Sequence, residues 1–295
     1  MRMRYSVLAI AAVAALALTG CVDNSTPNKG DGPQVKVGTD AAAVALLPKK
    51  IKDSGKLIIG IDPTYAPNES KDDAGNPIGW DVELADAMAA KLGLKADYQI
   101  SSFDKIIPSI TGGTYDIGVS SFTDNVEREK AVDFVNYFTA GVQWAQPIGK
   151  SVDPKNACGL TVSVQATTFE ETEELPAASK ACTDAGKAPI KILKFDKQDD
   201  ATTAVADGRA DAMSADSPIT LYAISKLKDK IEPAGPAFDA APYGVAVKKN
   251  SDLTKAIQKA LQSMLDDGSY TKILTKWGVE SGALSEITIN AASKG

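Results

Sequence analysis

Lys56-Leu57-Ile58-Ile59-Gly60-Ile61 is a short apolar run that predicts a buried parallel strand, and the segments after it decide the fold. A helix over residues 82–92 is expected next, with Asp81 as its cap and Gly93 as its stop. The pattern then predicts a strand, a helix and a strand over residues 98–100, 103–111 and 115–120. This β-α-β-α-β alternation predicts an α/β fold that binds ligands at the carboxyl ends of its strands.

A similar alternation begins again after Pro147. It predicts a second α/β lobe, with a cleft between the two lobes. The expected strands cover residues 160–164, 191–195, 210–214 and 243–247, and the expected helices cover residues 169–180, 197–207, 217–226, 253–267 and 270–277.

The composition favours a globular binding protein over an enzyme. Of the 295 residues 44% are apolar and none is histidine, which excludes histidine-dependent triads, zinc helices and general bases. Acidic residues number 38 against 32 basic ones, and no long Lys/Arg run occurs, which argues against nucleic acid as a partner. The sequence has no G-x-x-x-x-G-K-[ST], G-x-S-x-G or C-x-x-C motif. We therefore expect no cofactor, no metal ion and no enzymatic activity.

The N-terminus predicts export and lipid anchoring. Residues 1–20 combine Arg2 and Arg4 with an uncharged apolar run and small residues, which is typical of a signal peptide. The apolar run is shorter than the roughly 20 residues that a membrane-spanning helix needs. Leu18-Thr19-Gly20-Cys21 resembles the bacterial lipobox, in which the cysteine is acylated; an ordinary cleaved signal with a chance cysteine is the alternative. Residues 21–53 are then interpreted as the lipidated Cys21 and a flexible tether.

The other two cysteines, Cys158 and Cys182, are expected to form a disulfide. They are an even remainder in an exported chain, where disulfides persist. A catalytic thiol is disfavoured because no histidine exists to activate it. A metal site is disfavoured because only two thiols are present.

Several segments, in one order along the chain, carry a family resemblance. They are Gly60-Ile61-Asp62-Pro63-Thr64-Tyr65-Ala66-Pro67, residues 79–85, residues 103–108, residues 115–121, Glu127-Arg128-Glu129-Lys130, Ala210-Asp211-Ala212 and residues 267–278. Together they make residues 54–280 similar to the family 3 extracellular solute-binding proteins, the amino-acid receptors of ABC importers.

This resemblance implies a two-lobed periplasmic-binding-protein-like fold of type II, in which two α/β lobes joined by two crossover strands close on one ligand. The crossovers are expected near residues 138–142 and 239–243. Lobe 1 is expected to combine residues 54–139 with 243–280, lobe 2 to comprise residues 140–242, and residues 281–295 to form a C-terminal tail.

The resemblance also implies that Arg128 and Asp216 hold the two charged ends of an amino acid. A carboxylate beside an ammonium calls for a fork of positive donors near a negative acceptor. Arg128 is expected about one turn into a helix starting near Thr123 or Asp124, where guanidinium and helix-start amides could meet the carboxylate. Asp216 would accept the ammonium. Without the resemblance, Arg128 is a solvated residue of a charged run and Asp216 a helix cap.

Other expected ligand contacts surround this pair. Ser120, Ser121 and Thr123 match positions that supply hydroxyl and main-chain hydrogen bonds, and Thr168 matches a lobe 2 donor to the carboxylate. Ordinary loop polarity is the alternative for these four residues.

The side-chain pocket is expected to involve Asp62, Tyr65 and Phe103. Two aromatic faces and a carboxylate favour an amide or a cation over an acid. The alternatives are core residues for Tyr65 and Phe103 and a turn former for Asp62. The sequence departs from the family at Asn68, Asn125-Val126, Ala166 and Phe169, and Phe169 could narrow the lobe 2 wall.

These features predict an extracytoplasmic, lipid-anchored receptor that captures a polar or cationic L-amino acid and delivers it to an ABC permease in the membrane. The chain resembles the lysine/arginine/ornithine-binding and glutamine-binding branches, and a monomer is expected. The alternatives are a dehydratase-like periplasmic enzyme on the same fold and an amino-acid sensor.

Overall fold

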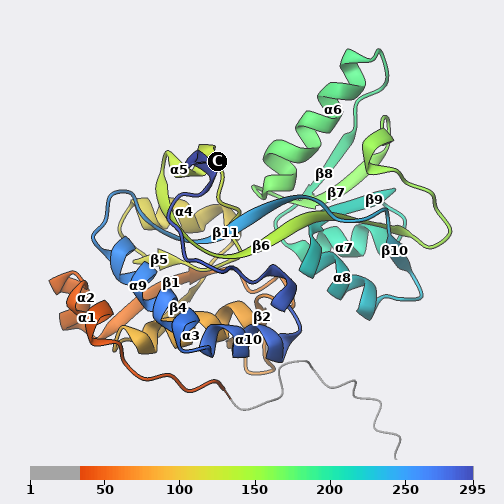
Figure 1. Cartoon of the computed structure of the whole chain (residues 1–295). Coiled ribbons are helices and arrows are strands. Elements are labelled where there is room, and N and C mark those ends of the chain that lie inside the picture. The colour runs from red at the N-terminus through yellow and green to blue at the C-terminus, as the bar shows by residue number, and fades with distance from the viewer. Residues whose placement is uncertain (1–33, 295) are drawn as a thin grey trace, which may run out of the picture.

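The computed structural model describes residues 34–294, which form two lobes joined by two long strands (Figure 1). The predicted signal peptide and the acylation site at Cys21 lie outside these described residues. No helix in this described part of the chain has the length and apolar character needed to cross a membrane.

One mixed sheet runs through both lobes in the strand order β4-β1-β5-β11-β6-β9-β7-β8. Its centre is the antiparallel pair of β6 (Val132–Pro147) and β11 (Phe238–Lys248). Both strands pass from one lobe into the other, so they are the two crossovers (Figure 1). The two-lobed α/β fold expected from the sequence is confirmed.

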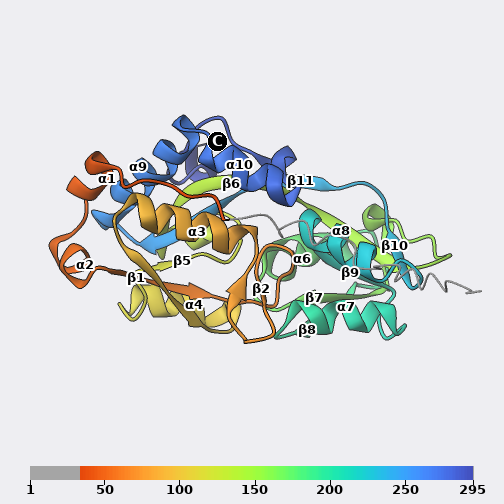
Figure 2. The same cartoon turned by 90° about the horizontal axis from the view of Figure 1, so that it is seen from below.

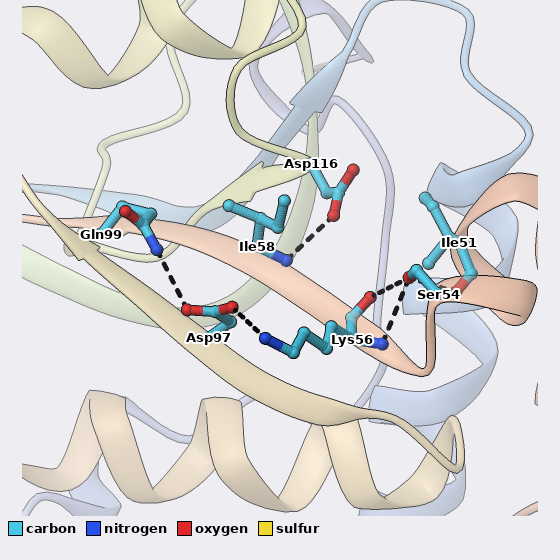
Figure 3. Close-up of polar contacts among 7 residues, drawn as sticks. All are labelled: Ile51, Ser54, Lys56, Ile58, Asp97, Gln99 and Asp116. Carbon is cyan, nitrogen blue, oxygen red and sulfur yellow. Dashed lines mark hydrogen bonds and ion pairs between the residues drawn. The ribbon is translucent and has the colours of Figure 1, made fainter.

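In lobe 1, β1 (Lys56–Ile61) lies parallel to its two neighbours, β4 (Lys95–Ile100) and β5 (Ile117–Gly118), and β11 pairs antiparallel with β5. Polar side chains tie these strands together where β1 begins (Figure 3). Lys56 pairs with Asp97 at 3.1 Å, and the Asp116 carboxylate accepts the Ile58 N–H at 2.9 Å. β5 is shorter than the predicted strand 115–120 at both of its ends.

Helices cover both faces of the lobe 1 sheet. α3 (Trp80–Lys91), α9 (Leu253–Asp266) and α10 (Ser269–Trp277) lie on one face, and α4 (Phe103–Thr111) lies on the other (Figure 2). The Trp80 ring packs against Phe138 of β6 with the ring centroids 4.6 Å apart. A short hairpin of β2 (Ser70–Lys71) and β3 (Pro77–Ile78) precedes α3.

Lobe 2 repeats the parallel arrangement, with β7 (Thr161–Gln165) between β8 (Lys191–Phe195) and β9 (Ala212–Asp216). The short strand β10 (Ile231–Pro233) pairs with β6. The helical segments of lobe 2 are a 3₁₀ turn over Pro154–Asn156, a π-helical turn over Glu170–Glu174, α6 (Leu175–Asp184), α7 (Gln198–Ala206) and α8 (Ser217–Lys226).

The predicted disulfide is confirmed. Cys158 is bonded to Cys182 of α6, with the two Cα atoms 5.5 Å apart. This separation lies within the range of an unstrained bridge. The bond ties the loop before β7 to α6 within lobe 2.

The expected cap of α3 is wrong. The helix begins at Trp80, so Asp81 lies in its first turn rather than before it. Gly79 precedes the helix with a φ of 139°, and a Cβ there would come within 1.9 Å of the Asn68 carbonyl oxygen. The Asp81 carboxylate is instead engaged by the Ser121 N–H and the Tyr137 hydroxyl.

The expectation of a flexible tether is wrong for residues 34–53. α1 (Ala41–Ala45) and α2 (Lys49–Ser54) form there, and the Asp40 carboxylate caps α1 by accepting the Ala42 and Ala43 N–H groups. Ala43 and Leu47 are buried in the lobe 1 core. Burial of this small apolar face is the physical reason that the segment packs.

The C-terminal segment also packs on lobe 1. It contains 3₁₀ turns over Glu280–Gly282 and Ala292–Lys294, and Ile289 bridges Val135 of β6. The Ser293 N–H donates to Glu129 at 3.2 Å, which places the chain end beside α5 (Val126–Glu129) (Figure 1).

Candidate ligand-binding site

A cavity lies between the lobes where β1, β7 and β9 reach their carboxyl ends. The structure brings all nine predicted ligand residues to this cavity: Asp62, Tyr65, Phe103, Ser120, Ser121, Thr123, Arg128, Thr168 and Asp216. Phe169, which the sequence analysis expects at the lobe 2 wall, also lines it. Sequence reasoning missed two lining residues, Gln165 and Glu170.

Arg128 is half-buried at the cavity and is not a solvated surface residue. Its Nη1 donates to the Thr123 carbonyl and its Nη2 to the Thr167 carbonyl, both at 2.8 Å. Its guanidinium lies 5.6 Å from the centroid of the Phe103 ring. Burial lowers the pKa of Arg128, although a guanidinium stays charged in proteins. The cavity therefore contains one fixed, oriented cation.

The helix that carries Arg128 differs from the prediction. α5 begins at Val126, not near Thr123 or Asp124, and it has four residues. Its Arg128 N–H is taken by the Asn125 side chain at 2.7 Å. The helix-start amides therefore add little to an anion site, and the guanidinium is the main positive group.

Asp216 is the last residue of β9 and is buried. Asp216 occupies the N-cap position of α8, as the helix-cap alternative expects, but its carboxylate makes no capping hydrogen bond to that helix. It accepts the Tyr65 hydroxyl at 2.7 Å. Burial raises the pKa of Asp216 to about 6, while the hydrogen bond from Tyr65 and the charge of Arg128 oppose that shift.

Asp62 lies in the cavity just beyond β1. Its carboxylate accepts the Phe103 N–H at 3.2 Å, the Thr64 hydroxyl at 3.0 Å and the Gln165 side-chain N–H at 2.9 Å. Burial raises the pKa of Asp62. The Phe103 ring stacks on Phe122, with their centroids 4.6 Å apart. This end of the cavity thus combines an aromatic face with an oriented carboxylate.

The lobes are in contact across the cavity. Hydrogen bonds join lobe 1 to lobe 2 between Tyr65 and Asp216, Asp62 and Gln165, Arg128 and the Thr167 carbonyl, and Asn125 and Glu173. Two residues beside the cavity, Ser121 and Thr167, have positive φ angles of 50° and 64°. Such backbone strain is typical of functional sites.

The hydroxyl groups of the expected site are largely engaged within the protein. Ser120 Oγ accepts the Asp62 N–H at 3.1 Å, and the Thr168 hydroxyl donates to the Gln165 carbonyl at 2.9 Å. Ser121 uses both its N–H and its hydroxyl on buried carboxyl groups, which leaves its carbonyl oxygen for a ligand. Asn68 does not line the cavity; it donates to Ser121 Oγ and accepts the Trp80 indole N–H.

Glu170 is the most informative residue that sequence reasoning missed. It is 1% exposed, and its Oε1 is buried without a hydrogen-bond partner. Burial raises its pKa well above the ordinary value, and the charge of Asp216 raises it further. The sequence places Glu170 in a helical segment, where no local signal distinguishes it from the acidic residues that follow. Gln165 was detectable, because it ends a strand as Asp216 does.

Within residues 34–294, no group of three or more Cys, Asp or Glu side chains is arranged to hold a metal ion. The cavity instead presents an oriented cation from lobe 1 and a buried carboxylate from lobe 2. An α/β protein whose two lobes meet around such a cavity belongs, by fold and site, to the solute-binding proteins. The chain is a member of the bacterial extracellular solute-binding proteins, family 3, whose profile matches residues 57–280.

Individual relatives and solved structures match between 76% and 92% of the chain. The arginine-binding protein ArgT of Corynebacterium glutamicum is 42% identical over 276 residues, which cover 92% of this chain and 91% of that protein. An ancestral arginine-binding protein bound to arginine has a TM-score of 0.70 at 35% identity, covering 76% of this chain and 98% of its own. Its structure bound to glutamine has a TM-score of 0.70 at 34% identity, covering 77% and 99%.

Proposed function

We propose that this protein is the lipid-anchored, extracytoplasmic substrate-binding component of an ABC importer, with arginine as its preferred ligand. One observation carries the proposal: Arg128 of lobe 1 and Asp216 of lobe 2 line the same closed cavity. Arg128 would bind the ligand carboxylate and Asp216 its ammonium, so one zwitterion links both lobes. Closure is then a population shift driven by contacts from both lobes.

The charges of the cavity favour a cationic side chain. Three buried carboxyl groups, Asp62, Glu170 and Asp216, line the cavity with one guanidinium, and Glu170 contributes least negative charge because its pKa is raised well above the ordinary value. A ligand with an additional positive charge compensates such an excess, whereas an additional carboxylate would add to it. The arginine-binding relatives support this choice, and the glutamine-bound ancestral structure supports testing an amide side chain as well.

The test of ligand identity is calorimetric titration with arginine, lysine, ornithine, histidine, glutamine and glutamate. We expect arginine to bind 1:1 with a Kd of about 1 μM or lower. A preference for glutamate would contradict the assignment of the pocket.

Asp62→Asn is expected to weaken arginine binding strongly and glutamine binding only slightly. The substitution keeps an oxygen for the Phe103 and Gln165 donors but removes the negative charge beside the ligand's distal cation. Loss of one charge-assisted hydrogen bond should cost about 1.5 to 3 kcal/mol, or roughly tenfold or more in Kd. The measurement is the ratio of arginine to glutamine affinity in wild type and variant, and an unchanged ratio would show that Asp62 does not face the side chain.

The binding role is favoured over an enzymatic one. In the proposed complex, the charged groups of the cavity bind the two charged ends of a zwitterion. The Arg128 guanidinium also donates hydrogen bonds to a carbonyl group of each lobe, which suits a binding role better than a catalytic one. Incubation with the bound amino acid should return it unchanged, and formation of any product would favour the dehydratase-like alternative.

The proposed lipid anchor is tested at Cys21. The proposal that Cys21 is acylated is supported by the resemblance of residues 1–20 to a signal peptide. Cys21→Ser is expected to abolish acylation and to release the protein from membranes while leaving arginine affinity unchanged. Incorporation of labelled fatty acid and membrane fractionation measure this. A variant that stays membrane-bound, or a wild type without label, would contradict the anchoring proposal.

A further inference from the structure

A buried carboxyl pair lies directly behind the loop that carries Ser121. Glu69 and Asp81 are both 0% exposed, and each places one oxygen near Ser121 Oγ, at 3.1 Å and 3.2 Å. The other oxygen of each, Glu69 Oε1 and Asp81 Oδ1, is buried without a hydrogen-bond partner. Among the described residues, neither carboxyl pairs with a lysine or arginine. Two carboxyl groups in such a place cannot both be ionised without a large cost, so the pair needs a proton.

The hydrogen atoms around Ser121 Oγ show where that proton belongs. The Trp80 indole N–H donates to Asn68 Oδ1 at 2.7 Å, which orients the amide so that Asn68 Nδ2 donates to Ser121 Oγ at 2.8 Å. The Ser121 hydroxyl has one hydrogen and can donate it to only one carboxyl group. The second carboxyl contact therefore needs a hydrogen on the carboxyl group itself.

Asp81 is the better acceptor of the two. Its Oδ2 already accepts the Ser121 N–H at 3.1 Å and the Tyr137 hydroxyl at 2.9 Å, and hydrogen bonds of this kind stabilise a negative charge. The Glu69 carboxyl has fewer such donors: beside its contact with Ser121 Oγ at 3.1 Å, the neighbouring Ser120 hydroxyl also stabilises its charged form. We propose that Glu69 is a protonated, uncharged acid that donates its hydrogen to Ser121 Oγ, and that it is a positioning residue for the ligand loop.

The surrounding charges support this assignment. Burial raises the pKa of Glu69 well above its ordinary value, and the charge of Asp81 raises it further, with a smaller contribution from Asp62 beyond β1. Burial raises the pKa of Asp81 to about 7, while hydrogen bonds from Tyr137 of β6 and from Ser121 oppose the shift. Tyr98 of β4, the other titratable group that senses Asp81, has a raised pKa and stays neutral.

The network matters for binding because Ser121 lines the cavity in a strained conformation, with a φ of 50°. Serine rarely adopts this region, so surrounding contacts must hold it there. The Glu69 main chain also pairs with that of Tyr65, a second cavity residue, at 2.9 Å and 3.2 Å. Glu69 thus links two ligand-contacting segments of lobe 1. This part of the inference rests on the proposed function.

The proton itself is tested without any ligand. The infrared difference spectrum of wild type minus Glu69→Gln at pH 7 is expected to contain the C=O band of a protonated carboxyl group. The exposed Glu280→Gln variant is the matched control and should not remove this band. If the band is missing from the Glu69 difference spectrum, the proposal is overturned.

The asymmetry between the two carboxyl groups is tested by urea unfolding. Glu69→Gln keeps an uncharged donor and should leave the free energy of unfolding nearly unchanged. Asp81→Asn removes the charged acceptor of three donors and should cause a clear loss of stability. Equal tolerance of both variants, or greater damage from Glu69→Gln, would overturn the placement of the proton on Glu69.

The positioning role is tested by arginine titration. Glu69→Gln is expected to bind within about twofold of wild type, whereas Glu69→Leu, which has no donor, should bind about tenfold or more weakly. If Glu69→Gln loses as much arginine affinity as Glu69→Leu, the positioning role is wrong. If Glu69→Leu does not fold, the Glu69→Gln variant alone decides, because a clear loss of its arginine affinity contradicts the proposal. If wild type binds no arginine but the infrared band is present, the proposed ligand fails and the protonated Glu69 stands.

Discussion

Arg128→Ala is expected to weaken arginine binding by about 2 to 5 kcal/mol, which is roughly a 30-fold to several-thousand-fold increase in Kd. The truncation leaves the ligand carboxylate without its charged donor in a closed cavity. It also leaves the Thr123 and Thr167 carbonyls without the N–H groups that now reach them from opposite lobes. Calorimetric titration with arginine measures the effect.

Two matched variants distinguish a direct contact between the Arg128 guanidinium and the ligand from the effect of positive charge alone. Arg128→Lys keeps the positive charge but loses the planar fork, so it should recover only part of the affinity. Arg209→Ala removes an exposed arginine of lobe 2 that stacks on Phe195, and it should bind arginine as wild type does. Unchanged affinity in Arg128→Ala would show that the carboxylate binds elsewhere.

Asp216→Ala is expected to have an effect of similar size, about 2 to 5 kcal/mol, on arginine affinity. The substitution removes the acceptor for the ligand ammonium and leaves the Tyr65 hydroxyl without its partner. The control is Asp229→Ala, which removes an exposed aspartate of the same lobe. Wild-type affinity in Asp216→Ala would contradict the role of Asp216.

The pH dependence of binding provides a second test of Asp216. Its pKa is raised to about 6 by burial, so the carboxylate that holds the ammonium is fully charged above that pH. As the pH falls below about 6, protonation removes the acceptor and arginine affinity should decline by up to tenfold per pH unit. In Asp216→Asn this acid decline should be missing and affinity should be low throughout. An acid decline of equal steepness in Asp216→Asn would assign it to another group.

Much of the fold could be predicted from local patterns. The expected helices over residues 103–111 and 217–226 and the expected strand over residues 191–195 coincide with α4, α8 and β8. Apolar periodicity is sufficient there because each element buries one continuous face. The prediction of a flexible tether failed for residues 34–53 because the side chains of Ala43 and Leu47 are buried in the lobe 1 core and dock this segment on it.

The sequence predicted which residues line the candidate site, but not their hydrogen-bond partners or their burial. The family resemblance located nine cavity residues, but it did not show that the N–H and the hydroxyl of Ser121 are already engaged in hydrogen bonds with the buried carboxyl groups of Glu69 and Asp81. It also did not reveal Glu170, whose importance comes from burial beside Asp216 and not from any sequence motif.

The sequence by itself determined the strand and helix alternation, the absence of histidine chemistry, the pairing of Cys158 with Cys182 and the positions of the charged residues at strand ends. These properties depend on residue type and on neighbours a few positions away. The tertiary structure decided which groups are hydrogen-bonded to each other and which charged groups are buried away from water. Tyr65 meets Asp216 across 151 positions, and Gln165 meets Asp62 across 103. Protonation and ligand contacts depend on burial and on such distant partners, and these exist only after the chain has folded.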